Sequence, residues 1–325
     1  MSDDSYKQDI RNSGMPLRRG LPSVNLLYLR RNNFFENLKR PIYFYTLGDY
    51  VIKILSGRQP LCHPTNAAAT GLFNLIANDW NKTLLKAVAP KKMNFPEVGT
   101  NSFEVELAGK HVKFFPALGD QQAALYGAGL SSDSMLSFNI GTGGQVSKIL
   151  SSAEFSADYQ VRPFLNGKYI KTIPHIPSGR ALNVYFRFFK DILQKFNVMQ
   201  SDEDIWRVIL EAETKAVDDC GMECDLSFFE NAVSTSTMGS ITNIGEHSLT
   251  VSNLMKCIIT QLSNNFLKAA EKIEPNPPNV KKVLFSGGVA RNIKSVRDKI
   301  LVKYDTADCE VADHDTLHGL FRYAN

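Results

Sequence analysis

The chain has 325 residues, 43% of them apolar, and 37 Lys and Arg against 33 Asp and Glu, which gives a formal net charge of +4. At about 150 residues per domain this length predicts two domains, and the apolar fraction can fill two cores. The small charge gives no case for a nucleic-acid or membrane-surface protein, and no apolar run reaches the length of a membrane span. Five cysteines, an odd number, suggest no disulfide framework, and the polar opening segment is neither a signal nor a transit peptide. We therefore expect a cytoplasmic protein with reduced thiols.

The first third of the chain predicts helices and one hairpin. Residues 1–13 are expected to be disordered, whereas apolar residues recur at helical spacing over 22–31 and again over about 45–55. A short helix is expected over 80–85, and alternating apolar residues over 103–115 predict a hairpin.

From about residue 116 onward, strands and helices alternate. A helix is expected over 120–127, and strands over 135–140 and 145–150 flank a glycine-rich turn. Asn166-Gly167 between two apolar runs predicts another hairpin. The remaining expected elements are helices over 181–195, 202–217 and 252–272, a strand over 282–285, a helix over 290–302, a strand over 308–311 and a helix over 317–323. This order predicts an α/β fold with a mixed sheet.

The first of three glycine-bearing loops spans residues 119–124. Its acidic residue, Asp120, lies at a strand-to-helix junction, where it can accept a proton from a substrate hydroxyl. Asp is also a favoured helix N-cap that complements the helix dipole, so the pattern alone leaves both roles open.

Two further loops combine glycines with the end of a strand. In residues 139–144, glycines and Thr142 let backbone N–H groups approach phosphate oxygens, although an ordinary hairpin turn has the same pattern. In residues 285–292, a strand enters Gly287-Gly288 and then a helix, which is common in nucleotide sites and in plain α/β connections.

Other nucleotide and metal motifs are absent from the sequence. No P-loop occurs, and no glycine cluster completes a dinucleotide fingerprint. Cys220 and Cys224 lack a second pair of ligands nearby, so we expect no metal site. The basic residues between Arg18 and Arg40 are interpreted as a solvated helix face.

Taken in this order, the three loops resemble those of the FGGY carbohydrate kinases, members of the actin/hexokinase-like ATPase superfamily. Residues 118–127 resemble the family's catalytic segment, residues 138–143 its second phosphate loop and residues 286–292 its adenosine loop. Upstream, residues 46–58 and 66–71 resemble the latter part of the sugar-binding domain. Four motifs in register are more specific than any one of them.

The resemblance implies two ribonuclease-H-like domains, with residues 1–115 as a remnant of the N-terminal sugar-binding domain and 116–325 as the C-terminal ATP-binding domain. It implies ATP and Mg²⁺ as cofactors and transfer of the γ-phosphoryl group to a sugar hydroxyl. Asp120 would be the general base and, with Gln121, would bind the sugar. The implied nucleotide contacts are Gly141, Thr142 and Gly143 at the phosphates and Gly287, Gly288 and Asn292 at the adenosine.

Two segments look most like the sedoheptulokinase branch of the family. They are residues 177–183 and 239–244, and xylulokinase and glycerol kinase are the nearest competitors. The implied substrate is therefore sedoheptulose or a related ketose.

Two family segments have no counterpart in the sequence. The sequence has no Asp-x-Gly-Thr, which is the family's first phosphate loop. The family's sugar-contacting segment has a Met directly before a His, and none of the six His here directly follows a Met. We therefore expect an incomplete first domain with unpaired strand edges and an exposed apolar face, and weak or absent activity of this chain alone. Three alternatives stay open: a fragment of an active kinase, a short product that pairs with a separate N-terminal fragment or a second copy, and a non-catalytic nucleotide-binding or interaction protein.

Overall fold

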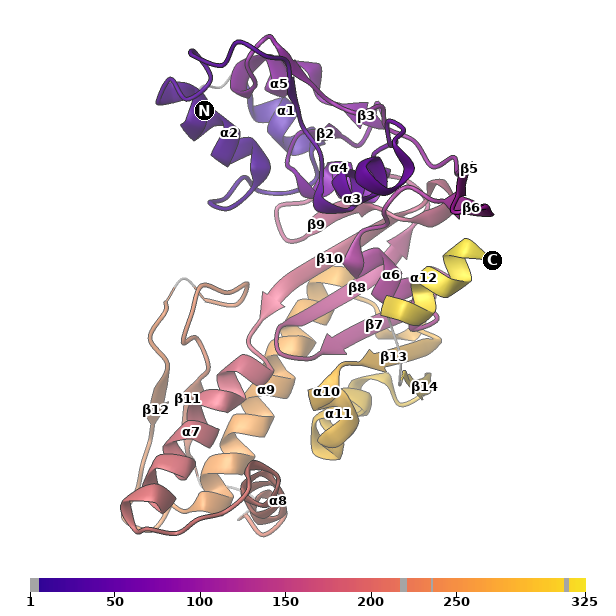
Figure 1. Ribbon diagram of the computed structural model, residues 1–325. Coiled ribbons are helices and arrows are strands. Elements are labelled where there is room, and N and C mark those ends of the chain that lie inside the picture. The colour runs from indigo at the N-terminus through magenta and orange to yellow at the C-terminus, as the bar shows by residue number, and fades with distance from the viewer. Residues whose placement is uncertain (1–5, 217–220, 235, 313–315) are drawn as a thin grey trace. The chain divides into compact units, whose positions relative to one another are not determined.

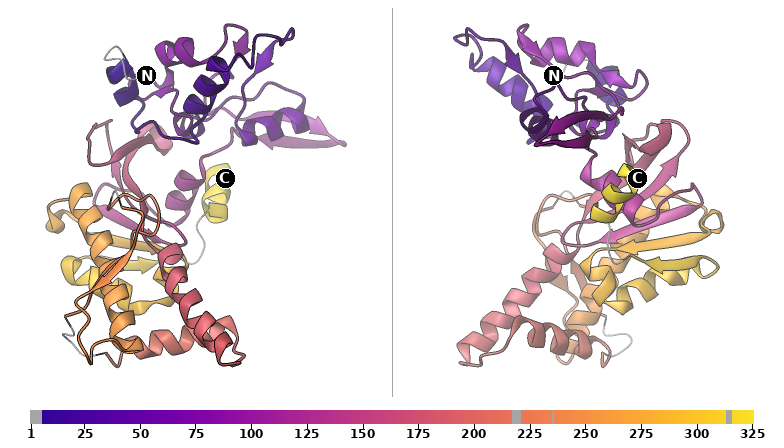
Figure 2. Two further views of the ribbon diagram at one scale, coloured as in Figure 1. Left: turned by 90° about the vertical axis from the view of Figure 1, so that its left-hand side faces the viewer. Right: turned by 45° about the vertical axis from the view of Figure 1, so that its right-hand side comes forward.

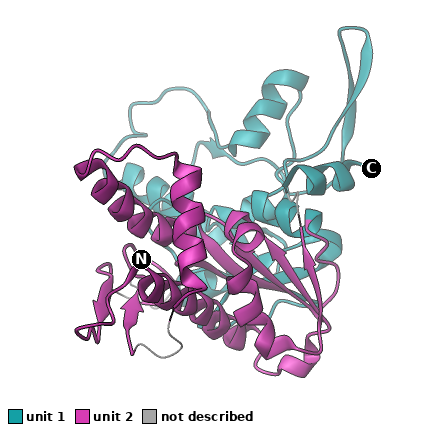
Figure 3. Cartoon of the chain, turned by 90° about the horizontal axis from the view of Figure 1, so that it is seen from below, with its two compact units in different colours: residues 1–127, 149–171, 314–325 teal, residues 128–148, 172–313 magenta. Residues whose placement is uncertain are grey.

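The computed structural model describes residues 6–216, 221–234, 236–312 and 316–325. The chain divides into two compact units (Figures 1 and 3): unit 1 is Met1–Gly127, Ile149–Lys171 and His314–Asn325, and unit 2 is Ala128–Lys148 and Thr172–Asp313. Each unit is made of separate segments of the chain, so the two units do not test the predicted domain boundary between residues 115 and 116. That boundary stays a prediction.

Unit 1 combines helices with pairs of short strands. Its helices are α1 (Lys7–Asn12), α2 (Pro22–Arg31), α3 (Leu47–Ser56), α4 (Pro64–Ala69), α5 (Lys82–Val88), α6 (Asp120–Gly127) and α12 (Thr316–Ala324). Its strand pairs are β1 (Ile42–Tyr43) with β4 (Met93–Asn94), β2 (Phe73–Asn74) with β3 (Asp79–Trp80), and β5 (Phe103–Leu107) with β6 (Lys110–Phe114). β9 (Gln160–Pro163) and the 3₁₀ turn Leu165–Gly167 also belong to this unit.

The helix α3 shows how local sequence sets an element and leaves one face open. Thr46 and Asp49 form a capping box at its start, and Gly57 ends it at φ +69°. Leu47 is 81% exposed and Ile54, seven residues on, is 64% exposed. These two residues share one side of the helix, so α3 has an exposed apolar face.

One expectation for the N-terminal segment is wrong. Residues 7–12 form α1 rather than a disordered lead-in, because Asn81 donates to the carboxylate of Asp9 at 2.9 Å and the N–H of Leu75 donates to the Asn12 oxygen at 2.9 Å. The basic residues between Arg18 and Arg40 are exposed, as expected, and one of them, Arg30, also donates to the Lys86 oxygen at 2.7 Å.

Unit 2 is built on strands and helices in alternation. Its strands are β7 (Met135–Ile140), β8 (Gly144–Leu150), β10 (Tyr169–Ile176), β11 (Glu223–Asp225), β12 (Ser240–Thr242), β13 (Lys282–Ser286) and β14 (Asp308–Val311). Its helices are α7 (Gly179–Lys195), α8 (Asp202–Glu213), α9 (Val251–Ile273), α10 (Gly288–Asn292) and α11 (Lys294–Leu301), with 3₁₀ turns at Pro277–Asn279 and Val302–Tyr304. Two residues of β8, Ile149 and Leu150, and the first three residues of β10, 169–171, belong to unit 1.

The main sheet has the strand order β14-β13-β7-β8-β10-β9. β13 is parallel to β7 and β14, and β7 is antiparallel to β8, so the predicted mixed sheet is confirmed. Phe138 of β7 stacks on Phe285 of β13 with ring centroids 5.5 Å apart, and Phe266 of α9 lies 6.4 Å from Phe138. The long helix α9, orange in Figure 2, therefore packs against this sheet. The helix expected over 290–302 is interrupted at Ile293, where the backbone is extended and α10 gives way to α11.

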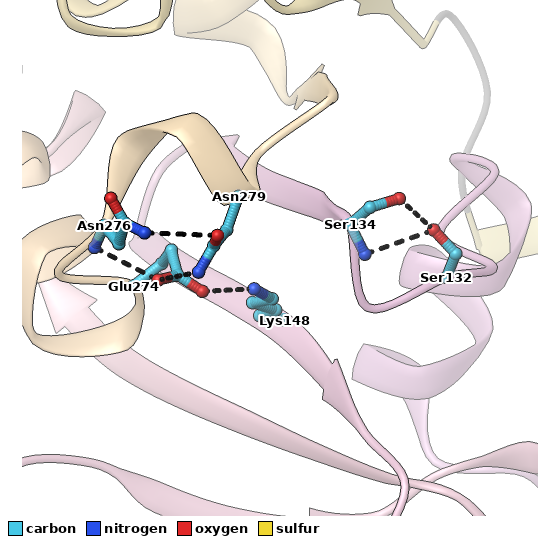
Figure 4. A network of polar contacts seen from close by, with 6 residues as sticks. All are labelled: Ser132, Ser134, Lys148, Glu274, Asn276 and Asn279. Atoms are coloured by element: carbon cyan, nitrogen blue, oxygen red, sulfur yellow. Dashed lines mark hydrogen bonds and ion pairs between the residues drawn. The ribbon is translucent and has the colours of Figure 1, made fainter.

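A buried ion pair joins the end of α9 to the sheet (Figure 4). Lys148 of β8 bonds to the carboxylate of Glu274, and both side chains are 9% exposed. The other oxygen of Glu274 accepts from the Asn276 N–H at 3.1 Å and from Asn279 at 3.2 Å. None of the helices in the described part of the chain combines the length and apolar composition that a membrane crossing needs.

Candidate functional site

Two neighbouring parallel strands of unit 2 end at the predicted nucleotide loops. β7 and β13 pair in register, with Phe138 opposite Phe285 and Asn139 opposite Ser286. The Asn139 amide donates to the Ser286 hydroxyl at 3.0 Å. Because the carboxyl ends of parallel strands meet at one edge, both glycine loops begin at the same place.

The glycines that follow these strands lie against one another. A Cβ on Gly287 would lie 2.6 Å from the Ile140 carbonyl carbon and 2.7 Å from the Gly141 nitrogen, and Gly287 has φ +89°. Only glycine permits both this approach and this conformation. The structure thus brings the second and third predicted loops together.

The start of α7 holds the loop between β7 and β8. The N–H of Gly179 and the hydroxyl of Ser178 donate to the Gly141 oxygen at 2.9 and 2.8 Å, and the N–H of Arg180 donates to the Thr142 oxygen at 2.9 Å. A Cβ on Gly179 would lie 2.7 Å from that Gly141 oxygen. Sequence reasoning assigned residues 177–183 only to a branch of the family, so it missed this supporting role.

The remaining predicted nucleotide residues surround this junction. Thr142 and Gly143 are exposed at the tip of the loop. Gly288 begins α10 with open space where a Cβ would stand, and the exposed Asn292 ends that helix. The junction is therefore lined by backbone and small side chains, as a site for phosphate oxygens needs to be.

In unit 1, Asp120 is the first residue of α6. It is exposed, and its carboxylate accepts from the N–H of Gln121 at 2.6 Å. This bond is to the N–H of the next residue and is not an N-cap contact, so the carboxylate is exposed at the start of the helix. Asp120 and Gln121 belong to unit 1 and the nucleotide loops to unit 2.

The backbone before α6 is fixed by two side chains from α4. The Thr65 hydroxyl accepts from the N–H of Gly119 at 2.9 Å, and Asn66 donates to the Ala117 oxygen at 2.6 Å. Within α6, Gln122 donates to the Pro163 oxygen at 3.0 Å. These contacts hold the position of Asp120.

A guanidinium that sequence reasoning missed lies beside this carboxylate. Arg162 of β9 donates to Gln121 at 2.9 Å and to Gln160 at 2.7 Å, and its Nε is buried without a hydrogen-bond partner. Burial lowers the pKa of Arg162 to about 10, the charge of Arg18 acts in the same direction, and the Asp120 carboxylate opposes both. An Arg 42 positions after the acid carries no local motif, so only the fold could reveal it.

The helix α12 packs closely on α6. A Cβ on Gly319 would lie 1.8 Å from the Ala123 oxygen, and Arg322 donates to the Tyr126 oxygen at 2.8 Å. The ring of Tyr323 lies edge-on to His63, with centroids 5.8 Å apart. The helix α12 thus stabilises the position of α6, which carries Asp120.

The comparisons with known proteins agree with this picture. Residues 2–127 match the model for the N-terminal domain of the FGGY family of carbohydrate kinases. These residues are therefore similar to an FGGY N-terminal domain. In sequence, it is 33% identical over 111 residues to a glycerol kinase of Shewanella halifaxensis, a match that covers 32% of this chain and 22% of the relative. A glycerol kinase of Bradyrhizobium is 34% identical over 106 residues, which is 31% of this chain and 21% of the relative.

Solved sugar-kinase structures resemble nearly the whole chain. A xylulose kinase from Rhodospirillum rubrum matches with a TM-score of 0.81 at 15% identity, over 99% of this chain and 66% of its own. A ligand-bound xylulose kinase from Lactobacillus acidophilus matches with a TM-score of 0.78 at 18% identity, over 97% of this chain and 65% of its own. The chain therefore has the actin/hexokinase-like fold of these structures, as predicted, and it spans less than two thirds of the length of each of them.

Proposed function

We propose that the chain acts as an ATP-dependent carbohydrate kinase that transfers the γ-phosphoryl group of MgATP to a sugar hydroxyl. The observation that carries this proposal is the junction of Gly141 and Gly287, where two strand ends present bare backbone at a place that a Cβ would fill. Backbone N–H groups at such a junction suit phosphate oxygens. The similarity of residues 2–127 to an FGGY N-terminal domain supports the same reaction class.

In this proposal the residues of unit 2 hold the nucleotide. Gly141, Thr142 and Gly143 contact the phosphates through N–H groups and the Thr hydroxyl, and Gly287, Gly288 and Asn292 cover the adenosine. Mg²⁺ would bridge phosphate oxygens and supply charge neutralisation there. The protein's own contribution is alignment, since phosphoryl transfer asks mostly for positioning and charge stabilisation.

In unit 1, Asp120 takes the proton of the attacking sugar hydroxyl. Its exposed carboxylate, fixed by the Gln121 N–H, suits a general base. Gln121 binds the sugar, and Arg162 orients Gln121 through its hydrogen bond at 2.9 Å. Arg162 is thus a positioning residue.

The substrate we propose is sedoheptulose or a related ketose. Support comes from residues 177–183 and 239–244, which resemble the sedoheptulokinase branch. Relatives in sequence and fold are named as glycerol, xylulose and gluconate kinases, so the test must include those acceptors.

The test is ADP release by the purified chain with MgATP and, in turn, sedoheptulose, xylulose, ribulose, glycerol and gluconate. We expect turnover with one acceptor that is lost in Asp120→Asn and kept in Asp133→Asn, a matched exposed carboxylate before β7. Nucleotide binding without turnover on any acceptor would favour the non-catalytic nucleotide-binding alternative. A chain that neither binds ATP nor turns over would overturn both.

A further inference from the structure

Unit 2 contains a cleft of about 680 Å³ that is not lined by any of the proposed nucleotide-binding residues. Its walls come from β11, from α9 and from the chain after β11, and β11 packs against α9. A volume of this size can admit a small molecule. Two cysteines, Cys224 of β11 and Cys257 of α9, line it together.

Both thiols belong to elements that pack together in the wall of this cleft. Cys257 is half-buried and its Sγ donates to the Met222 oxygen at 3.4 Å, two residues before Cys224. The interaction between the two thiols lowers the pKa of Cys257 and raises the pKa of Cys224, so Cys257 is the better nucleophile of the pair.

The other described cysteines lack this arrangement. Cys62 is fully buried, and burial raises its pKa, which makes it inert. Cys309 is exposed on β14 and is not among the residues that line the cleft. Among the residues that the structure describes, the cleft therefore holds the one pair of thiols on facing elements.

We propose that Cys224 and Cys257 form a reversible disulfide when a low-molecular-weight disulfide enters this cleft. The Cys257 thiolate attacks one sulfur of the reagent, forms a mixed disulfide and releases the first small thiol. The Cys224 thiol then gives up its proton and attacks the Cys257 sulfur, which releases the second small thiol. The two cysteines are oxidised, and the reagent is reduced to two thiols.

The walls of the cleft suit a reagent that carries both charges. Lys256 and Lys268 of α9 line it together with Glu223 and Asp225 of β11. Glutathione disulfide, with ammonium and carboxylate groups, meets both signs on these walls. The resulting bond would tie the β11–β12 ribbon to α9 and enclose residues 224–257 in a covalent loop.

The test is made on the whole reduced chain, which is incubated with glutathione disulfide under native conditions and then alkylated in denaturant. We expect peptide mapping to show loss of two of the five thiols in a single Cys224–Cys257 linkage that dithiothreitol reverses. The same treatment in urea should give mixed pairings, because the proximity is then lost. Cys309→Ser is the matched control and should leave the linkage unchanged.

Single variants separate the two steps. Cys224→Ser should stop at one glutathione bound to Cys257, whereas Cys257→Ser should leave Cys224 in its reduced form. Because the main result comes from the wild-type chain, a variant that fails to fold does not remove the test. Retention of all five thiols, or a native linkage that involves Cys220, Cys62 or Cys309, would overturn the proposal.

Discussion

Substitution of Gly287 by Ala tests the proposed nucleotide junction most directly. The new Cβ would lie 2.6 Å from the Ile140 carbonyl carbon, which is 0.8 Å less than the 3.4 Å at which ordinary contact begins. Gly287 has φ +89° and ψ 157°, a backbone region that is essentially restricted to glycine. Such a conformation costs about 1–3 kcal/mol for another residue, and the strands must in addition move apart.

The expected result is a loss of both stability and nucleotide affinity. Urea unfolding should show a decrease of about 1–3 kcal/mol, and titration calorimetry should show ATP bound at least about tenfold more weakly, since about 1.4 kcal/mol corresponds to a factor of ten. The matched control is Gly288→Ala, because its Cβ would meet nothing within 4 Å.

A comparison of Gly287→Ala with Gly288→Ala can contradict the proposed nucleotide junction in two ways. If Gly287→Ala and Gly288→Ala unfold at the same urea concentration, the close approach of the two loops is wrong. If Gly287→Ala is destabilised but binds ATP as tightly as wild type, the junction is structural and the proposed phosphate site lies elsewhere.

Three further predictions concern packing and burial within the individual units. In Gly319→Ala the Cβ would lie 1.8 Å from the Ala123 oxygen, so α12 should leave α6, and limited proteolysis should remove the C-terminal segment faster than from wild type. Glu274→Gln leaves the buried Lys148 ammonium without its anion, and urea unfolding should show a loss of about 3–5 kcal/mol that Lys148→Met largely restores; no loss in the single variant would contradict a buried pair. Burial lowers the pKa of His63 from 6.5 to about 4. Between these pH values the unfolded chain binds a proton that the folded chain does not bind, so the free energy of unfolding should fall by about 3 kcal/mol as the pH falls from 6.5 to 4. His63→Asn replaces the capping nitrogen Nδ1 with an amide oxygen that does not titrate, so an equal slope in both chains would refute this origin.

Much of the local structure could be predicted from the sequence, because short-range signals decide it. The capping box of Thr46 and Asp49 starts α3, and Asn166, at φ 56°, makes the turn between β9 and β10 that Asn-Gly predicts. The strands that carry the glycine loops were also expected, because apolar runs end there. The loop motifs were enough to identify the fold, which the structural relatives confirm.

The sequence alone determined most of the helices and strands, the glycine loops and the acid at the start of α6; the tertiary structure decided which of them meet. The approach of Gly287 to Gly141 follows from the parallel pairing of β7 and β13, two strands more than a hundred residues apart in the chain. The helix α1, expected to be disordered, exists because Asn81 bonds to Asp9, and Arg162 reaches Gln121 only through the placement of β9. Such contacts depend on side chains far apart in the sequence, and no local pattern encodes them.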